Sequence, residues 1–429
     1  MMMKILILTP YIPYPVNSGG NQGFFGLIDR LRKKVDISIV LSAKPSDLDN
    51  IEKFRALWNN VSFHVYHKGE FKPDVKKPSY YNFLKGLRSS IERKLKRQQA
   101  NSNDLVRKYS TITTSDFYMP VEEGYVNFIH DVIKSENYDL IQVDFFEYIN
   151  MVNALPANIK KVFIHHELRY VREECEMRLF EKSKPMDYFL HNYSKSFEIG
   201  CLNNYDAVVT VTDVDKEKLK EELREDMFIE SSPAIIESKN MVLTDNFKFN
   251  NRLIFLGGSD HFPNLDAVDW FLKSCWENIQ RKNPDLELHI VGQWKSRLKK
   301  LYTERFSNIQ FRGFVENLQD ELQDAIMITP IRIGSGVRMK LLEAMEYGCP
   351  IVTTSVGSEG IGLENGQDCL IANNNISFAE AVLKLSGDKE LCDKFRKNAK
   401  QKFEARPYAE QLAEVRLNIY KKILCLPKK

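Results

Sequence analysis

The sequence predicts an α/β protein built from two doubly wound, Rossmann-like domains that face each other across a cleft. Short, continuous apolar runs alternate with helical patterns, which is typical of parallel sheets covered by helices on both faces. A second series of such runs begins after a polar stretch at 244–251, and 429 residues suit two domains of about 200 residues each. In open sheets of this kind ligands bind beyond the carboxyl ends of the strands, so we expect the site in the cleft.

Apolar runs of three to seven residues place the strands of the two domains. In the first half we expect strands at Ile5–Leu8, Val35–Leu41, Leu140–Val143, Val162–Ile164 and Ala207–Val211. In the second half we expect them at Leu253–Leu256, Leu286–Val291, Ala325–Ile328 and Pro350–Thr353. The predicted domains are therefore 1–244 and 245–405. The last segment, 406–429, has the apolar spacing of a helix and no strand after it, and the first domain offers one surface on which it could pack.

Composition excludes several classes of protein. Lys and Arg number 61 against 58 Asp and Glu, and this balance is too close to neutral for nucleic-acid binding by the whole chain. The seven cysteines form no CxxC pair, which favours reduced, buried thiols over a disulfide framework or a metal site. The first apolar run is only four residues long, too short for a secretory signal or a membrane span, so we expect a cytoplasmic protein.

One segment departs from this neutral balance. Residues 68–107 carry eleven Lys or Arg against four acids, with Tyr80, Tyr81, Phe83 and Leu84 beside them. This basic insertion predicts either a solvated helix or a surface for an anionic acceptor or an anionic lipid leaflet, which would bring the protein to the inner face of the cell membrane.

The densest chemical signal lies at 330–353. The strand expected just before this stretch leads into a loop with Gly334, Ser335 and Gly336, and a helix is expected from about Val337 to Tyr347. Free N–H groups and the positive end of the helix dipole at such a loop suit a diphosphate.

Charged side chains near the start of this helix strengthen that interpretation. Arg338 and Lys340 add formal positive charge, which would stabilise a diphosphate leaving group. Glu343 lies further along, and its side chain leans back toward the helix start, where a carboxylate can accept two hydrogen bonds from a ribose diol. We therefore expect a nucleotide-diphosphate pocket in the second domain.

Polar residues also follow the strands of the first domain. His165 and His166 end the run at Val162–Ile164, and a histidine there can donate a hydrogen bond to a sugar hydroxyl or relay a proton. Asp144 or Glu147 is a weaker candidate for contact with an acceptor. Asp213-Val214-Asp215 has the spelling of a metal-binding DxD pair, but its place directly after a strand favours a helix cap.

Taken together, these segments resemble the retaining GT-B glycosyltransferases of family 4, also described as glycosyl transferases group 1. Besides 330–353, the resemblance rests on Leu253-Ile254-Phe255-Leu256-Gly257-Gly258, Phe262-Pro263-Asn264, Ile290-Val291-Gly292, Gly313-Phe314-Val315 and Val356-Gly357-Ser358-Glu359-Gly360-Ile361. It covers the second half specifically and the first half more loosely.

The resemblance implies a GT-B fold and transfer of a sugar from a nucleotide donor, with retention of anomeric configuration and without a metal or other cofactor. It places Val315, Glu359 and the Gly19-Gly20 loop near the donor, and it favours His166 over His165 as the histidine that faces the donor sugar. UDP and GDP are the expected carriers, and a glycan or lipid-linked glycan of a bacterial surface polysaccharide is the expected acceptor.

One position departs from the family pattern of two glutamates separated by seven residues. The second glutamate maps to Glu343, but Ser335 stands at the first position, as in the subgroup with Gly334-Ser335-Gly336-Val337-Arg338. The usual Arg and Lys pair is also not evident in 257–261, so Arg338 and Lys340 would neutralise the phosphates.

Two other functions remain open at this point. A GT-B hydrolase or epimerase acting on the nucleotide sugar would share the donor pocket, and a non-catalytic partner would bind the donor without transfer. An NAD-dependent dehydrogenase is disfavoured, because no GxGxxG follows either first strand.

Overall fold

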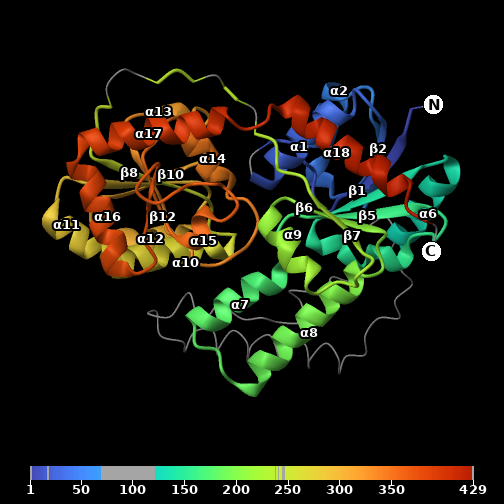
Figure 1. Cartoon of the computed structure of the whole chain (residues 1–429), viewed down its shortest axis with the longest axis horizontal. Coiled ribbons are helices and arrows are strands. Elements are labelled where there is room, and N and C mark those ends of the chain that lie inside the picture. Colours follow the sequence, from blue (N-terminus) through green and yellow to red (C-terminus); the bar gives the residue numbers. More distant parts are fainter. Residues whose placement is uncertain are drawn as a thin grey trace.

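Two parallel sheets, each covered by helices on both faces, form the body of the chain (Figure 1). The computed structural model describes residues 2–16, 19–68, 121–236, 238–239, 241–243 and 247–427. The α/β class with two doubly wound sheets is confirmed. The expected domain boundary at 244/245 and the basic insertion beyond Lys68 lie outside the described residues.

The first sheet has the strand order β3-β2-β1-β4-β5-β6-β7, with all neighbours parallel. Its strands are β1 (Lys4–Leu8), β2 (Asp36–Ala43), β3 (Ser62–His67), β4 (Leu140–Asp144), β5 (Lys160–His165), β6 (Ala207–Thr210) and β7 (Phe228–Ser231). The helices between them are α1 (Gly19–Leu31), α2 (Leu48–Leu57), α6 (Glu123–Ser135), α7 (Arg169–Leu179), α8 (Pro185–Leu202) and α9 (Asp213–Lys220), with 3-10 turns η1 (Pro45–Asp47) and η3 (Phe146–Ala154).

The second sheet has the order β10-β9-β8-β11-β12-β13 and is also parallel. Its strands are β8 (Arg252–Leu256), β9 (Glu287–Val291), β10 (Ile309–Gly313), β11 (Ile326–Thr329), β12 (Ile351–Thr353) and β13 (Leu370–Ile371). Its helices are α10 (Phe262–Phe271), α11 (Glu277–Lys282), α12 (Ser296–Arg305), α13 (Leu318–Leu322), α14 (Met339–Glu346), α15 (Ser355–Ser358), α16 (Asn375–Gly387) and α17 (Lys389–Glu404), with a π-helical turn η4 (Leu272–Trp276).

Alternate residues of the central strands supply the cores on the two faces of each sheet. On β1, Leu6 and Leu8 join one apolar cluster, whereas Ile5 and Ile7 join the cluster on the opposite face. Every one of these four side chains is at most 1% exposed, so both faces are covered. This double burial explains why the central strands appear in the sequence as continuous apolar runs.

The edge strands β3, β7, β10 and β13 are the ones that the apolar runs did not predict. Their side chains are mostly exposed or half-buried, because an edge strand has a neighbour on one side only. An alternating or mixed pattern at such positions gives a weaker signal than a fully buried run.

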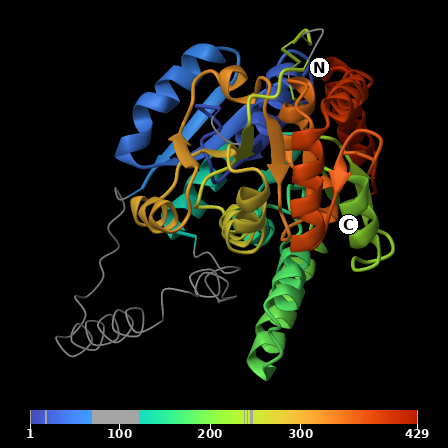
Figure 2. The ribbon, with the colours of Figure 1, turned by 90° about the vertical axis from the view of Figure 1, so that its left-hand side faces the viewer.

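The last helix, α18 (Ala409–Leu424), crosses back from the second domain and packs against the first. In Figure 1 it lies along α1, far in sequence but adjacent in space. Leu412, Ile419 and Ile423 enter the apolar cluster that also contains Ile5 and Ile7. The chain therefore passes between the domains twice, and Figure 2, turned by 90°, shows the same helix at the outside of the first domain.

Within the described ranges, no helix is both long and apolar enough to cross a membrane. None of the seven cysteines is paired with another, and six of them are buried.

The packing of α18 generates a stability prediction. Replacing the fully buried Ile423 by Ala should destabilise the first domain by about 2–5 kcal/mol, because the deletion leaves a cavity in its core. On the same helix Val415 is 42% exposed, and Val415→Ala should change the free energy of unfolding by about 0.5 kcal/mol or less. Urea unfolding, followed by hydrogen exchange in each domain, measures the change in the free energy of unfolding for both variants. Equal effects of the two substitutions would contradict the placement of α18.

Candidate functional site

The starts of two helices from different domains meet between the sheets. α1 begins at Gly19, after β1, and α14 begins at Met339, after the loop that follows β11. A Cβ added at Gly19 would lie 3.0 Å from the Cβ of Met339, so the two helix starts are in contact. Because the N-terminus of each helix carries partial positive charge and free N–H groups, their meeting point favours an anion.

The loop before α14 needs glycine at two positions. Gly334 has φ +128° and Gly336 has φ +76°, both in the region that residues with a side chain rarely adopt. A Cβ on Gly336 would lie 2.3 Å from the carbonyl oxygen of His166. Glycine therefore lets this loop touch the backbone of the first domain.

The glycine loop is buried and hydrogen-bonded to the first domain. The Ser335 hydroxyl accepts a hydrogen bond from the Leu168 N–H at 2.6 Å, and the Gly336 N–H donates to Asp215 Oδ2 at 3.0 Å. We expected these N–H groups to face a ligand; in the structure a carboxylate of the first domain takes the place of an anion at Gly336. The loop thus joins the domains as well as opening α14.

Arg338 is the N-cap residue of α14, two residues after the glycine loop. Its Nη1 donates to the carbonyl oxygen of Gly336 at 2.6 Å, whereas its buried Nη2 has no hydrogen-bond partner among the described residues. Burial lowers the pKa of Arg338, and the charge of Glu167 opposes that shift. A buried guanidinium nitrogen without an acceptor is costly, and it is suited to binding an added anion.

Glu167 lies beside this guanidinium. Burial raises its pKa, but Arg172, His261 and the neighbouring arginines outweigh burial, so that the pKa is lowered overall. The Arg172 Nη1 lies 3.6 Å from Glu167 Oε2. Burial also lowers the pKa of His261, to about 4, so this histidine is neutral near pH 7.

Lys340 lies in the first turn of α14. Its Nζ donates to Asn264 Oδ1 at 2.7 Å and lies 4.5 Å from the centre of the Phe255 ring. Burial, reinforced by the charge of Arg338, lowers the pKa of Lys340 to about 7. Among the described residues, no carboxylate lies within ion-pair distance of its Nζ, and an anion that approached it would favour the protonated form.

Glu343 connects the two domains from the next turn of α14. Its Oε1 accepts a hydrogen bond from Gln22 Nε2, on α1, at 2.9 Å. Burial raises the pKa of Glu343. Glu343, the acid expected from the sequence, therefore lies at the domain boundary, where the Gln22 amide of the first domain donates a hydrogen bond to it.

The two candidate histidines have different partners. His166 Nε2 lies 3.0 Å from Asp144 Oδ1, and its ring stacks on Phe145 at 4.2 Å between centres. His165 is buried, with its Nε2 2.7 Å from Glu198 Oε1. The partly exposed His166 is therefore the one that can reach a ligand.

Asp144 and Glu147, the two acids considered for contact with an acceptor, interact with other side chains of the protein. Asp144 is buried and binds both His166 and the Gln142 amide, the latter at 2.6 Å. Glu147 Oε1 lies 3.8 Å from a guanidinium nitrogen of Arg169. Asp144 orients the His166 ring and is not itself open to an acceptor.

The remaining predicted positions are Glu359, Val315 and Gly20. Glu359 accepts a hydrogen bond from Lys218 Nζ, on α9, at 2.8 Å, which is another contact between the domains. Val315 is partly buried and packs on the apolar cluster under α14, and Gly20 follows Gly19 in the first turn of α1.

The Asp213-Val214-Asp215 segment starts α9. Thr212 is its N-cap residue, and the Thr212 hydroxyl accepts from the Asp215 N–H. Burial raises the pKa of Asp215. In the part of the chain that is described, no cluster of three or more His, Cys, Asp or Glu side chains could hold a metal ion.

Several residues of the site were not singled out from the sequence. Gln22 is on α1, Asp215 is on α9, and His261 and Asn264 are at the start of α10, so their contacts form only in the tertiary structure. Asn264 gave the clearest signal, because it stands in the Phe262-Pro263-Asn264 segment at the start of α10.

Comparison with known proteins shows what the chain resembles. Residues 250–388 match the family described as Glycosyl transferases group 1. An uncharacterized 44.6 kDa protein in the cps region of Klebsiella pneumoniae is 24% identical over 414 residues, covering 91% of this chain and 94% of that protein.

Solved structures show the same architecture. TarM, from S. aureus, superimposes with a TM-score of 0.69 over 98% of this chain and 99% of that chain, at 12% identity. Anabaena Alr3699/HepE in complex with UDP gives a TM-score of 0.63 over 98% of this chain and all of that one, at 11% identity. The fold is therefore GT-B, as the resemblance implied.

The contact at Gly336 generates a prediction about the domain arrangement. In Gly336→Ala the new methyl group would collide with His166, so the domains should separate and the radius of gyration should increase. Gly366 has a similar φ of +78° but no atom near its added Cβ, so Gly366→Ala shares the backbone strain without the clash. Small-angle scattering compares the two. An unchanged radius in both variants would contradict the tight contact.

The lowered pKa of Lys340 generates a second prediction. At pH 8 a group with a pKa of about 7 is mostly neutral, and a bound diphosphate should raise that pKa, so UDP binding should take up close to one proton. Calorimetry in buffers of different ionisation enthalpy measures this uptake. In Lys340→Arg, which stays charged, the uptake should disappear while binding persists. Equal uptake in both proteins would assign the proton to another group.

Proposed function

We propose that this protein is a retaining, metal-independent glycosyltransferase of family 4. It would transfer a hexose-type sugar from UDP or GDP to a hydroxyl group of a glycan or lipid-linked glycan. The observation that carries the proposal is the contact between the N-termini of α1 and α14. Arg338, Lys340 and Glu343 stand in the first turns of α14, in the segment that matches Glycosyl transferases group 1.

The charges at this point support a nucleotide diphosphate as the donor. Arg338 Nη2 and Lys340 Nζ supply cationic donors for phosphate oxygens, and the helix starts add N–H groups. Glu343, held by Gln22, is the group for a ribose diol. The complexes of Alr3699/HepE and TarM with UDP support uracil as the first base to test.

Preorganised positive charge is the main contribution to rate in this proposal. As the bond between the anomeric carbon and the diphosphate breaks, negative charge grows on the leaving oxygen, where Arg338, Lys340 and the start of α14 stabilise it. The acceptor hydroxyl forms the new bond on the same face and gives its proton to the departing phosphate. This front-face route retains configuration without an enzyme nucleophile.

His166 is the first-domain residue that we assign to the donor sugar. The Asp144 carboxylate accepts a hydrogen bond from the Nε2–H of His166. This favours the tautomer in which the Nδ1 of His166 carries no proton and can accept a hydrogen bond from a sugar hydroxyl. Stacking on Phe145 holds the plane of the ring. The residue acts by orienting the sugar next to the leaving group.

We propose synthesis of a bacterial surface polysaccharide as the setting. The relative in the cps region of Klebsiella pneumoniae supports it. We place the reaction in the cytoplasm, with the basic insertion at 68–107 as the part of the sequence that would contact the inner face of the membrane.

A screen of nucleotide sugars tests the donor. UDP- or GDP-sugars should raise the melting temperature, since a ligand that binds only the native state stabilises it, whereas CMP-sugars should not. Arg338→Ala and Lys340→Ala should each lower kcat at least tenfold, and Lys384→Ala, an exposed lysine on α16, should not. Unchanged kinetics in both site variants would reject the phosphate assignment, and donor binding without transfer would indicate a non-catalytic partner.

The stereochemistry and the metal requirement need a separate measurement. Proton NMR of the product should show the anomeric configuration of the donor, and activity should persist in excess EDTA. Inversion of configuration, or loss of activity that Mg²⁺ or Mn²⁺ restores, would overturn this part of the proposal. Release of free sugar without an acceptor, at the rate of transfer, would indicate a hydrolase.

A further inference from the structure

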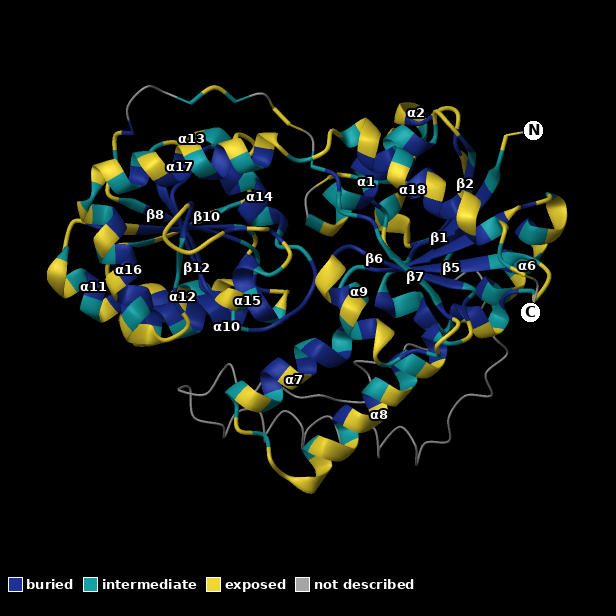
Figure 3. Cartoon of the chain, in the orientation of Figure 1, coloured by how far each residue is buried: buried dark blue, intermediate teal, exposed yellow. Residues whose placement is uncertain are grey.

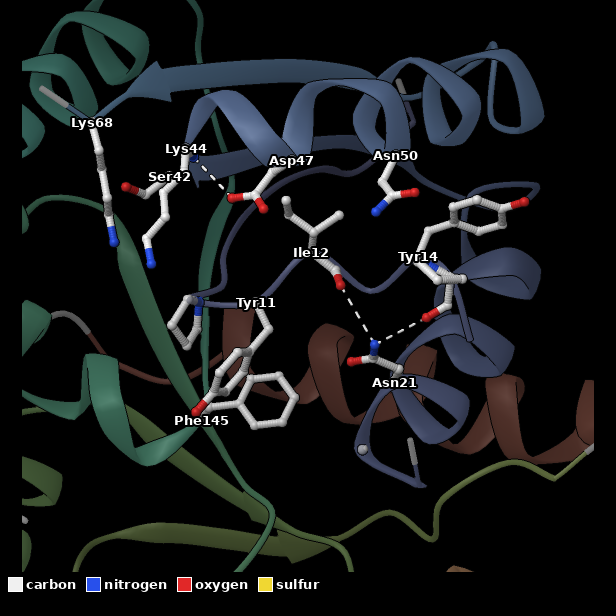
Figure 4. A pocket seen from close by; sticks show the side chains of 13 residues that line it. Tyr11, Ile12, Tyr14, Asn21, Ser42, Lys44, Asp47, Asn50, Lys68 and Phe145 are labelled. Carbon is white, nitrogen blue, oxygen red and sulfur yellow. Dashed lines mark hydrogen bonds between the residues drawn. The ribbon is translucent and has the colours of Figure 1, made fainter. Parts of the chain in front are cut away.

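A cavity of about 570 Å³ opens at the carboxyl edge of the first sheet, beside the site described above. It lies where β1, β2 and β3 end, and Figure 4 shows the side chains around it. Its lining consists of Pro10, Tyr11, Ile12, Tyr14, Pro15, Gly20, Asn21, Ser42, Lys44, Asp47, Asn50, Lys68 and Phe145. Apart from Gly20 and Phe145, none of these residues has a role in the donor assignment.

Two lysines on neighbouring strands point their ammonium groups into this cavity. Lys44 follows β2 and Lys68 follows β3, and both side chains descend to the same side of the cavity in Figure 4. Among the described residues, no ion pair is recorded for either ammonium group. Asp47 is the one acid in the lining, and its carboxylate accepts from the Lys44 N–H at 2.9 Å and from the Ser46 hydroxyl at 3.2 Å. The formal charge of the lining is therefore positive.

This positive charge is separate from the start of α1, where the donor phosphates would bind. Neighbouring strands in a sheet lie about 4.8 Å apart, so β3 is about 10 Å from β1. That separation is comparable to the length of a sugar ring with its linkages. Lys44 follows β2, one strand from β1, and Lys68 follows β3, two strands from it, so a group bound by both lysines lies toward the edge of the sheet. We assign to them a second anion and not the diphosphate of the donor.

An aromatic wall joins the cavity to the site. Tyr11 is 45% exposed and packs edge-on against Phe145 at 5.1 Å between ring centres. Phe145 in turn stacks on His166 and has φ +67°, an unusual value for an aromatic residue, which aims the ring between cavity and histidine. A ligand lying in the cavity would therefore reach the residue that we assign to the donor sugar.

We propose that this cavity binds the acceptor and that the acceptor carries a carboxylate or phosphate, which Lys44 and Lys68 recognise while a sugar ring packs on Tyr11. The proposal rests on the proposed function, and it names the chemical class of the acceptor. Asn50 and Ser42 add neutral polar groups that can bind hydroxyls of the same chain.

Matched pairs of neutral and anionic glycans test the proposal. One pair is an oligosaccharide with a terminal glucuronic acid and its carboxyl-reduced counterpart, which ends in glucose. The other is a glycan with a terminal glycerol phosphate and the same glycan after dephosphorylation. Calorimetry with UDP present should give at least tenfold tighter binding of the anionic member in one pair, and that pair identifies the anion as carboxylate or phosphate.

The variant Lys44→Gln/Lys68→Gln should reduce this preference to less than twofold. Lys53→Gln, an exposed lysine on α2 outside the cavity, should leave the preference unchanged. Circular dichroism and the melting temperature check that both variants are folded.

Equal binding of anionic and neutral members, binding of neither, or a preference that survives in the double variant would overturn the proposal. UDP binding is measured separately on the wild-type protein. If the wild-type protein shows no charge preference but still binds UDP, this inference alone is rejected, whereas absence of UDP binding rejects the proposed function.

Discussion

The site depends on the contact between the glycine loop of one domain and the strand-end loop of the other. Two glycines with positive φ allow the backbone at 334–336 to meet His166 and Leu168, and no side chain larger than hydrogen fits at Gly336. This contact brings the start of α14 against the start of α1 and places Glu343 within hydrogen-bond distance of Gln22. The groups that we assign to a donor therefore come from both domains, and each domain alone holds only part of the site.

The electrostatics of the contact follow from burying charges without enough partners. Among the described residues, the buried Nη2 of Arg338 has no hydrogen-bond partner. Burial disfavours the charged forms of Lys340 and Glu343, so the pKa of Lys340 falls to about 7 and the pKa of Glu343 is raised. Asp215 already supplies one carboxylate to the loop. An added anion with several oxygens would relieve the costs at Arg338 and Lys340 together, which is why we assign these two cations to a diphosphate and not to a neutral ligand.

The sequence predicted the architecture and the chemistry of single elements better than the pairing between elements. Fully buried strands such as β1 and β8 leave continuous apolar runs, and the glycine loop with Arg338 and Lys340 leaves a local pattern, so both could be predicted. The edge strands β3 and β10 could not, because partial exposure weakens the pattern. Gln22, Asn264 and Asp215 were missed, because each acquires its role from a partner 76 to 321 positions away, as the contacts Asn264–Lys340, Asp215–Gly336 and Gln22–Glu343 illustrate. The use of the glycine loop as a domain contact likewise depends on the tertiary arrangement and has no local signature.

Hydrogen exchange with and without UDP tests the central claim most directly. If the two helix starts form one anion site, UDP should slow exchange at the backbone N–H groups of residues 19–22 and 337–340 together, at the same concentration of UDP. Protection confined to one of these segments, or to neither while UDP binds elsewhere, would contradict the account.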